Sequence, residues 1–220
     1  MRILVLGGGG REHAIVTSLV ASPHVTAVLV APGNGGTAAV AENVSLSIEN
    51  GEAVAAFARE NEIALVVIGP EVPLVAGVAD AVRAVGIAAF GPGAEGARLE
   101  GSKEFAKEIM RRHHLPAGES RAFTAIEPAL AYLEETGAPV VVKADGLAAG
   151  KGVTVAMDLS VARDAVRECF AGRFGDAGST VLIEEYLAGP ECSILAFTDG
   201  HTVLPMAPAQ DHKRAYEDDQ

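Results

Sequence analysis

The sequence predicts an α/β fold, with a doubly wound parallel sheet in the first hundred residues and a different, α+β arrangement after it. Short runs rich in valine and leucine alternate with helical segments up to about residue 100, as in parallel sheets. Glycine-containing turns follow these runs at 7–10, 32–36, 69–71 and 91–93, the strand ends at which such sheets bind ligands. The pattern changes at a boundary near residues 100–120.

The elements follow in chain order from the apolar runs and the segments between them. In the first region, strands are expected at 2–6, 25–31, 64–70 and 87–92, with helices at 11–22, 53–59 and 74–85. The second region opens with a helix that Ser102 caps and Pro116 ends. Further helices are expected at 126–136 and 160–172, and strands at 140–145, 152–157, 180–187 and 191–198.

Composition and net charge exclude several classes of function for this chain. The chain is 49% hydrophobic and 21% charged, which is enough to bury a core, and its formal net charge of −12 argues against a nucleic-acid binder. No apolar run approaches the roughly 20 residues that span a bilayer. Cys169 and Cys192 show no metal-binding spacing and are expected as reduced core thiols. We therefore expect a cytoplasmic protein that binds neither nucleic acid nor membrane.

The turn GGGGREHA lies between a strand and a helix but fails the dinucleotide fingerprint. The register from Gly7 puts Glu12 at the third glycine position, and the register from Gly8 puts His13 there, which disfavours an NAD-linked oxidoreductase. A glycine turn at a helix N-terminus can still bind a phosphate, with Arg11 or His13 adding a contact. The alternative is a plain strand-to-helix turn.

Glu71 in GPEVPL also leaves two interpretations open. A carboxylate at a strand end, flanked by prolines, suits hydrogen bonds to sugar hydroxyls. The same residue could instead be an acid at a helix start that complements the helix dipole.

The stretch VVKADGLAAGKGVTV is a strand–loop–strand and not a P-loop. The spacing from Gly146 to Gly150 is one residue short, Lys151 is followed by Gly152, and a strand comes next. Lys143 within the first strand is a candidate phosphate ligand under a flap of small residues. The alternative is a surface hairpin with solvated lysines.

Two further segments are weak indications of a ligand site when each is taken by itself. Glu184, Glu185 and Glu191 surround the end of the strand in IEEYLAGPEC, where they could bind an adenine edge and ribose hydroxyls or simply be solvated. Lys103 near the start of its helix would usually lie on the surface.

In combination and in this order, the segments are a specific signal of one type of protein. The order of Lys103, Lys143 with its glycine loop, IEEYL and Glu191 resembles the ATP-grasp superfamily. More narrowly, the chain resembles the glycinamide ribonucleotide synthetase (phosphoribosylamine–glycine ligase) family over essentially all 220 residues. The motifs that carry this resemblance are GGGGREHA, PGNGGT, GPEVPL, SKEFAKEIM, VVKADGLAAGKGV, IEEYLAGPECS and QDHKRAYEDDQ.

The resemblance implies an ATP-dependent ligase of purine biosynthesis, monomeric at full length. Glycine would be activated as glycyl phosphate, and the amine of 5-phosphoribosylamine would displace phosphate, giving glycinamide ribonucleotide and ADP. By resemblance the catalytic residues are Lys143, Asp211, Lys213 and Arg214. The ATP-binding residues are Lys103, Lys143, Gly150, Lys151, Gly152, Glu184, Glu185, Leu187 and Glu191. The residues for phosphoribosylamine are Gly8, Gly9, Gly10, Arg11, His13, Asn34, Gly35, Gly36, Thr37 and Glu71.

The resemblance also implies that the chain is an incomplete ligase. The expected domains are a substrate-binding domain (1–101), a linker helix (102–119), the small ATP-grasp subdomain (120–189) and the start of the large one (190–220). The family's Mg²⁺ ligands would lie beyond residue 220, so little or no activity is expected from this chain alone, and an uncovered apolar face would promote self-association. The alternatives are another ATP-grasp ligase or carboxylase, or a non-catalytic nucleotide-binding module.

Overall fold

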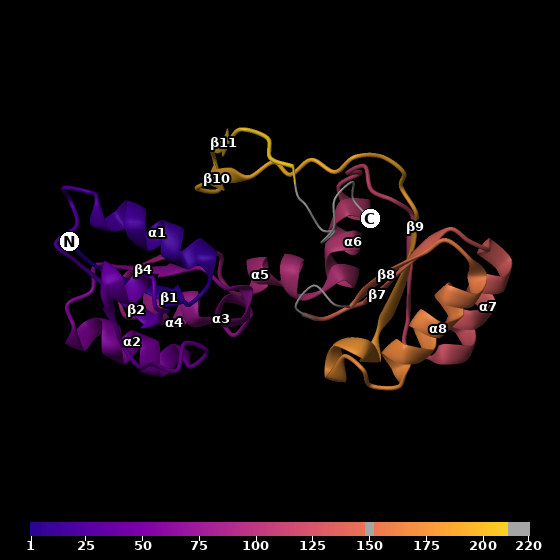
Figure 1. Cartoon of the computed structure of the whole chain (residues 1–220), viewed down its shortest axis with the longest axis horizontal. Helices are drawn as coiled ribbons and strands as arrows, with labels where there is room; N and C mark the ends of the chain where they lie inside the picture. The colour runs from indigo at the N-terminus through magenta and orange to yellow at the C-terminus, as the bar shows by residue number, and fades with distance from the viewer. Residues whose placement is uncertain (148–151, 211–220) are drawn as a thin grey trace. The chain divides into compact units, whose positions relative to one another are not determined.

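The computed structural model describes residues 1–147 and 152–210. The chain divides into two compact units, Met1–Glu185 and Tyr186–Gln220, and each is described by itself. The first unit contains two sheets and the second contains a short hairpin (Figure 1). The domain boundaries expected after residues 101, 119 and 189 stay predictions.

A five-stranded, all-parallel sheet forms the centre of the first hundred residues, which confirms the predicted fold class. The strands lie in the order β3-β2-β1-β4-β5, so the chain starts in the middle and winds in both directions. They are β1 (Arg2–Gly7), β2 (Ala27–Pro32), β3 (Glu42–Asn43), β4 (Leu65–Ile68) and β5 (Ala88–Phe90). Gly7 pairs with Pro32 and Leu6 with Ile68, so the glycine turns after β1, β2 and β4 meet at one edge.

Helices cover both faces of this sheet because successive side chains of a strand point to opposite sides. Leu4 and Leu6 of β1 belong to the core that contains α2 (Gly51–Glu60) and α4 (Val78–Ala84). Ile3 and Val5 share the other core with Val16 of α1 (Gly10–Val20), and Figure 1 shows α1 and α2 on opposite sides of the sheet.

The predicted helix at 74–85 is wrong in its bounds. The segment forms two helices, α3 (Glu71–Val75) and α4, separated by Gly77, whose φ of +80° lies in the left-handed region that favours glycine. A further helix, α5 (Ala94–Gly101), was not predicted, because Ala97 alone is buried among its residues and its apolar periodicity is weak.

The second sheet is antiparallel, with the order β6-β9-β7-β8. Its strands are β6 (Ser120–Phe123), β7 (Val140–Ala144), β8 (Val153–Ala156) and β9 (Val181–Glu185). The helices α7 (Ile126–Thr136) and α8 (Leu159–Phe170) bury Val140, Val142 and Ala144 against one face. The pleat therefore directs Lys143 to the other face, and β6 is an edge strand that the sequence did not predict.

The helix α6 (Lys103–Arg112) begins where the sequence predicted. The side chain of Ser102 accepts a hydrogen bond from the backbone N–H of Phe105 at 3.1 Å, as an N-cap residue does. The last turn of α6 carries the basic residues Arg111 and Arg112, which complement the negative end of the helix dipole.

The second unit holds a hairpin of β10 (Ala196–Thr198) and β11 (Val203–Pro205). Only the last part of the strand predicted at 191–198 forms, while Ser193 makes an isolated bridge to Ala209. Cys192 is exposed here, so the expectation of a core thiol holds for Cys169 and is wrong for Cys192.

Large apolar side chains of this second unit remain exposed within the described residues. They are Leu187, Ile194, Leu195, Phe197, Val203, Leu204 and Met206.

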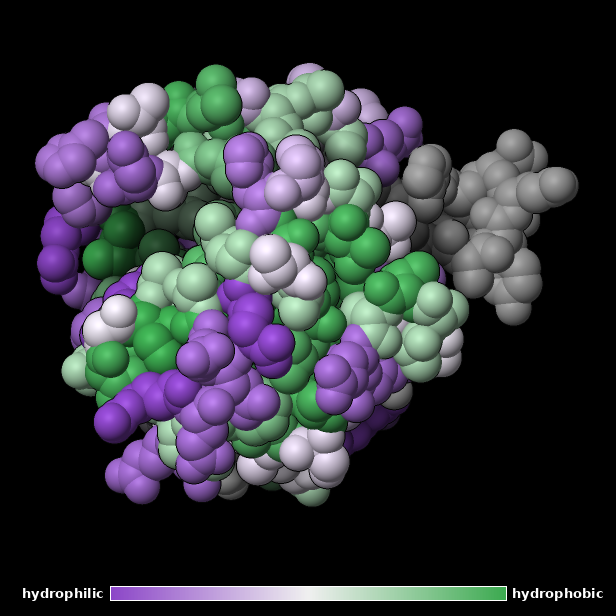
Figure 2. Space-filling view, turned by 90° about the vertical axis from the view of Figure 1, so that its left-hand side faces the viewer, coloured by the Kyte–Doolittle hydropathy of each residue, from purple (hydrophilic) through white to green (hydrophobic). Residues whose placement is uncertain are grey.

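Figure 2 shows hydrophobic patches (green) between hydrophilic ones (purple) on one face of the chain. Among the helices that the structure describes, none is long and apolar enough to cross a membrane.

Candidate nucleotide and substrate sites

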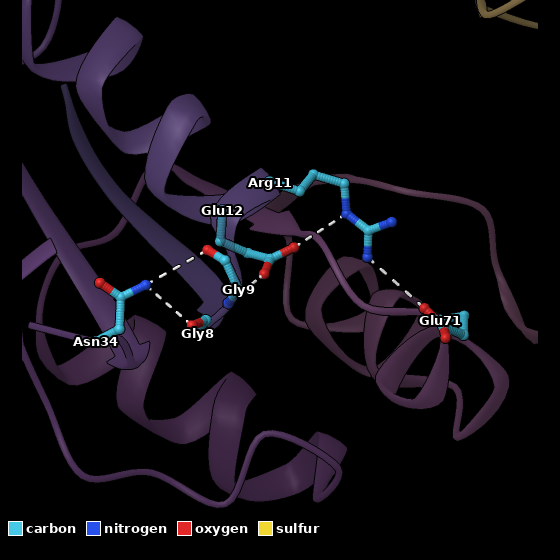
Figure 3. A network of polar contacts seen from close by, with 6 residues as sticks. All are labelled: Gly8, Gly9, Arg11, Glu12, Asn34 and Glu71. Atoms are coloured by element: carbon cyan, nitrogen blue, oxygen red, sulfur yellow. Dashed lines mark hydrogen bonds and ion pairs between the residues drawn. The ribbon is translucent and has the colours of Figure 1, made fainter. Parts of the chain in front are cut away.

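The glycine turn between β1 and α1 is built around a buried carboxylate. Glu12 is 3% exposed; its Oε2 accepts a hydrogen bond from Gly9 N–H at 2.7 Å, and its Oε1 accepts one from Arg11 Nε at 3.1 Å (Figure 3). A Cβ at Gly7, Gly9 or Gly69 would collide with this side chain. The glycines are required here because the Glu12 carboxylate occupies the space beside them, which the sequence alone did not indicate.

Asn34 ties the segment after β2 to the same turn. Its Nδ2 donates to the carbonyl oxygens of Gly8 at 2.9 Å and Gly9 at 3.4 Å (Figure 3), and its Oδ1 accepts from the backbone N–H groups of Gly36 and Thr37. Both donors and both acceptor positions of the amide are therefore engaged. Asn34 shapes this turn, and its side chain does not offer a free hydrogen-bonding group to a ligand.

Five other residues predicted to bind substrate lie in or beside this turn and differ in their surroundings. The ring of His13 occupies the place that a Cβ would take at Gly36, and Thr37 is fully buried. Gly10 and Gly35 have open space around their Cα atoms. A ligand that approaches this turn would meet the open glycines first, and His13 and Thr37 support the turn from behind.

Arg11 and Glu71 form the polar rim of this region. Arg11 Nη2 lies 3.7 Å from Glu71 Oε2, and the two side chains are 63% and 42% exposed (Figure 3). Glu71 is the first residue of α3, where a carboxylate complements the helix dipole. Both residues also line a cavity of about 480 Å³, so the structure leaves Glu71 accessible to a sugar as well.

A second cavity, of about 380 Å³, gathers three lysines and is called the lysine cavity below. Lys143 of β7 and Lys107 of α6 both contact Oε2 of Glu184 in β9, with N–O distances of 2.9 Å and 3.1 Å. The side chain of Glu184 is 8% exposed, and its Oε1 is buried with no hydrogen-bond partner among the described residues. A buried carboxylate with one unsatisfied oxygen is costly unless a ligand satisfies it.

Lys103, the third lysine of this cavity, is held by the base of the glycine-rich loop. Its Nζ donates to the carbonyl oxygens of Asp145 at 3.1 Å and Gly146 at 2.9 Å. Burial lowers the pKa of Lys103 below its ordinary value; the carboxylate of Asp145 opposes this shift and the nearby ammonium of Lys143 adds to it. The ammonium is thus partly desolvated, which strengthens its attraction for an anion.

Asp145 fixes the start of α6 to the end of β7. Its Oδ1 accepts a hydrogen bond from the backbone N–H of Glu104 at 2.7 Å, and its Oδ2 accepts one from the Ser102 hydroxyl at 3.0 Å. This contact places Lys103 beside the carbonyl oxygens of Asp145 and Gly146.

The structure describes some of the other residues predicted for ATP and not the rest. Gly152 lines the lysine cavity, whereas the Glu185 carboxylate accepts a hydrogen bond from Glu119 N–H at 3.2 Å. Leu187 and Glu191 belong to the second unit. Gly150, Lys151, Asp211, Lys213 and Arg214 lie outside the described residues.

Sequence reasoning missed Lys107, Glu12 and Asp145. Lys107 lies four residues after Lys103, a spacing that puts both on one face of a helix and could have indicated it. Glu12 lies three residues after Gly9, at the N3 position from which a Glu side chain accepts a hydrogen bond from the N-cap backbone N–H, and this spacing could have indicated it. Nothing local distinguishes Asp145, because its partners lie about forty residues away in the chain.

The lysine cavity can bind a polyanion that has an apolar part. Its walls carry the ammonium groups of Lys103, Lys107 and Lys143 together with the apolar side chains of Leu99, Met110 and Val153. A phosphate chain joined to a flat heterocycle has this combination of charge and apolar surface. This arrangement, on an antiparallel sheet that follows a parallel one, is that of an ATP-grasp protein.

Comparison with known proteins identifies the family. Residues 1–100 match the family description "Phosphoribosylglycinamide synthetase, N domain", and residues 101–220 match "Phosphoribosylglycinamide synthetase, ATP-grasp (A) domain". The chain belongs to the phosphoribosylglycinamide synthetase family.

Individual relatives agree with this assignment. The chain is 55% identical to a phosphoribosylamine–glycine ligase of Pasteurella multocida and 52% identical to one of Escherichia coli, in each case over all of this chain and 52% of the relative. A phosphoribosylamine–glycine ligase structure from Thermotoga maritima matches with a TM-score of 0.84 at 27% identity, over all of this chain and 52% of that one. The chain thus spans about half the length of the curated relatives it matches.

Proposed function

We propose that this chain contributes the amine-substrate domain and part of the ATP site of a phosphoribosylamine–glycine ligase. The observation that carries the proposal is the convergence of Lys103, Lys107 and Lys143 with buried Glu184 on one cavity. The names of the relatives supply the joining of glycine to phosphoribosylamine, and the ATP-grasp domain description supplies ATP as the energy source.

In this proposal the lysines neutralise the phosphates of ATP. A carboxylate is a poor acyl donor, so glycine is activated as glycyl phosphate before the amine of phosphoribosylamine displaces phosphate. Phosphoryl transfer depends on positioning and charge neutralisation more than on covalent chemistry by the protein. Lys103 and Lys143 suit this role, and the unpaired Oε1 of Glu184 suits acceptance of a hydrogen bond from the adenine amino group.

The other substrate would use the glycine turn of the first sheet. The open backbone at Gly10 and Gly35 and the exposed guanidinium of Arg11 suit a sugar phosphate, with Glu71 near its hydroxyls. The Glu12 carboxylate already takes the Gly9 N–H, so a phosphate here would depend on Arg11 and the neighbouring backbone.

Mg²⁺, the cytoplasmic location and the monomeric state belong to the same proposal. Within the described ranges there is no group of three or more His, Cys, Asp and Glu side chains that could hold a metal ion. No Mg²⁺ ligand is therefore assigned to these residues.

ADP release tests the proposal directly. The chain is combined with the C-terminal half of a curated relative, ATP and Mg²⁺, and glycine or phosphoribosylamine is left out in turn. We expect release only when both substrates are present, and little or none from the chain by itself. Release that needs neither substrate, or none in any combination although the chain binds ATP, would contradict the ligase assignment.

A further inference from the structure

Glu184 is compensated by two lysines that are held very differently. Lys107 Nζ contacts Glu184 Oε2 at 3.1 Å and also donates to the carbonyl oxygen of Gly118 at 3.0 Å, and its side chain is 14% exposed. Lys143 has Glu184 as its one hydrogen-bond partner within the described residues, and its side chain is 27% exposed. Lys107 is thus anchored at two points, whereas Lys143 can leave by breaking one contact.

We propose that Lys107 is a positioning residue that keeps Glu184 compensated while Lys143 turns from this carboxylate to the phosphates of a nucleotide. The inference rests on the proposed ATP site. Lys107 itself stays on Glu184 and Gly118 and acts through Lys143.

The balance of charge around Glu184 explains why a second lysine matters. An ionised carboxylate as buried as Glu184 is strongly destabilising when it has no cationic partner. A single lysine partner could therefore not leave it without a large cost in free energy. With Lys107 in place, one negative charge faces two positive ones, and the departure of Lys143 leaves a neutral pair behind. The second lysine therefore makes Lys143 available to a ligand without exposing a bare buried charge.

The test is a double-mutant cycle on ATP affinity, with Lys107→Met and Glu184→Gln alone and together. ATP binding is measured by calorimetric titration, without Mg²⁺. We expect Lys107→Met to weaken binding about tenfold or more, because Lys143 must then leave the carboxylate uncompensated. In the Glu184→Gln background the same substitution should change affinity less than about twofold, since no charge is left to compensate.

Two control variants separate charge from fold. Lys107→Arg keeps the cation and should bind ATP within about threefold of the unsubstituted chain. Arg111→Met removes an exposed cation from the same helix and should change affinity less than about twofold. Circular dichroism checks that each variant is folded.

A second readout needs no nucleotide. The rate at which acetic anhydride acetylates Lys143 is followed by mass spectrometry. Lys107→Met should slow this reaction at least about twofold, because Lys143 is then the one ion-pair partner of Glu184 and its Nζ leaves the carboxylate less often to meet the reagent. Glu184→Gln should speed it.

The outcomes separate this inference from the proposed function. An equal loss of ATP affinity from Lys107→Met in both backgrounds would make Lys107 a direct phosphate ligand and overturn the inference. Unchanged affinity in Lys107→Met would overturn it as well. If the unsubstituted chain binds no ATP even together with the C-terminal half of a curated relative, the proposed function is contradicted, and the acetylation rates alone then decide whether Lys107 acts on Lys143.

Discussion

Two buried glutamates, Glu12 and Glu184, lie at the two candidate sites and are satisfied in opposite ways. Both oxygens of Glu12 have partners, one of which is the backbone N–H of Gly9. Glu184 receives two ammonium groups on one oxygen and has no partner for the other among the described residues. Each residue is less than a tenth exposed.

We propose that this difference separates a carboxylate that stabilises the fold, Glu12, from one that binds a ligand, Glu184. Glu12 fixes the path of the backbone at a turn, so its loss should appear in the free energy of unfolding. The side chain of Glu184 contacts the lysine side chains Lys107 and Lys143, so its loss should appear in the affinity for a charged ligand.

Glu12→Ala should destabilise the chain by about 3 kcal/mol, because it empties the space between three glycines and leaves the Gly9 N–H without its acceptor. Urea unfolding followed by circular dichroism measures the change. The matched control is Glu52→Ala, which removes an exposed first-turn acid from α2 and should change stability by less than about 0.5 kcal/mol. If Glu12→Ala lowers the free energy of unfolding by less than about 1 kcal/mol, Glu12 does not have the structural role assigned to it.

Asp145→Ala should cost about 2 kcal/mol in the same unfolding experiment. The substitution removes the acceptors of the Glu104 N–H and the Ser102 hydroxyl, and so frees the start of α6 from β7. It should also weaken ATP binding, because Lys103 would lose its fixed place beside the carbonyl oxygens of Asp145 and Gly146. Unchanged stability would show that α6 is placed by other contacts.

Ser102→Ala should cost about 1 kcal/mol, the usual loss for an N-cap residue. Ser102→Asp, which can accept the same hydrogen bond, serves as the matched control and should recover part of the loss unless the nearby Asp145 repels it. If Ser102→Ala and Asp145→Ala together cost no more than either alone, the two residues act as one capping unit.

The pH dependence of Lys103 should be the smallest effect. Its folded-state pKa is lowered by burial, so the unfolded chain binds the proton more tightly, and stability should rise as pH increases from the folded pKa towards the ordinary value of 10.5. Lys143→Met removes a like charge and should raise the pKa of Lys103, shifting this rise to higher pH. Unfolding measured between pH 8 and 10.5 in both proteins checks the sign; identical profiles would contradict the coupling.

The fold was largely predictable because its signals are local. Apolar runs fixed the strands β1, β2 and β4, and the Ser102 cap fixed the start of α6. The break at Gly77 escaped prediction, because a glycine within a helical pattern indicates a left-handed residue only when its backbone angles are known.

The site was only partly predictable because its contacts join distant segments. The sequence indicated Lys103, Lys143 and Glu184 as neighbours of one ligand, and the structure brings them to one cavity. Their partners could not be read from the sequence, since the pairing of Glu184 with Lys107 depends on how α6 lies over β9. Asn34 and Thr37 were predicted as substrate contacts, yet their polar groups are used within the turn itself.

The most direct test of the central claim is the affinity of this chain for ATP, compared between Lys143→Met and Glu12→Gln. If the lysine cavity is the nucleotide site, Lys143→Met should weaken binding about tenfold or more, while Glu12→Gln should leave it within about twofold. Equal affinity in Lys143→Met and the unsubstituted chain would contradict the account. So would an equal loss in both variants, because the two buried glutamates would then not divide fold from function.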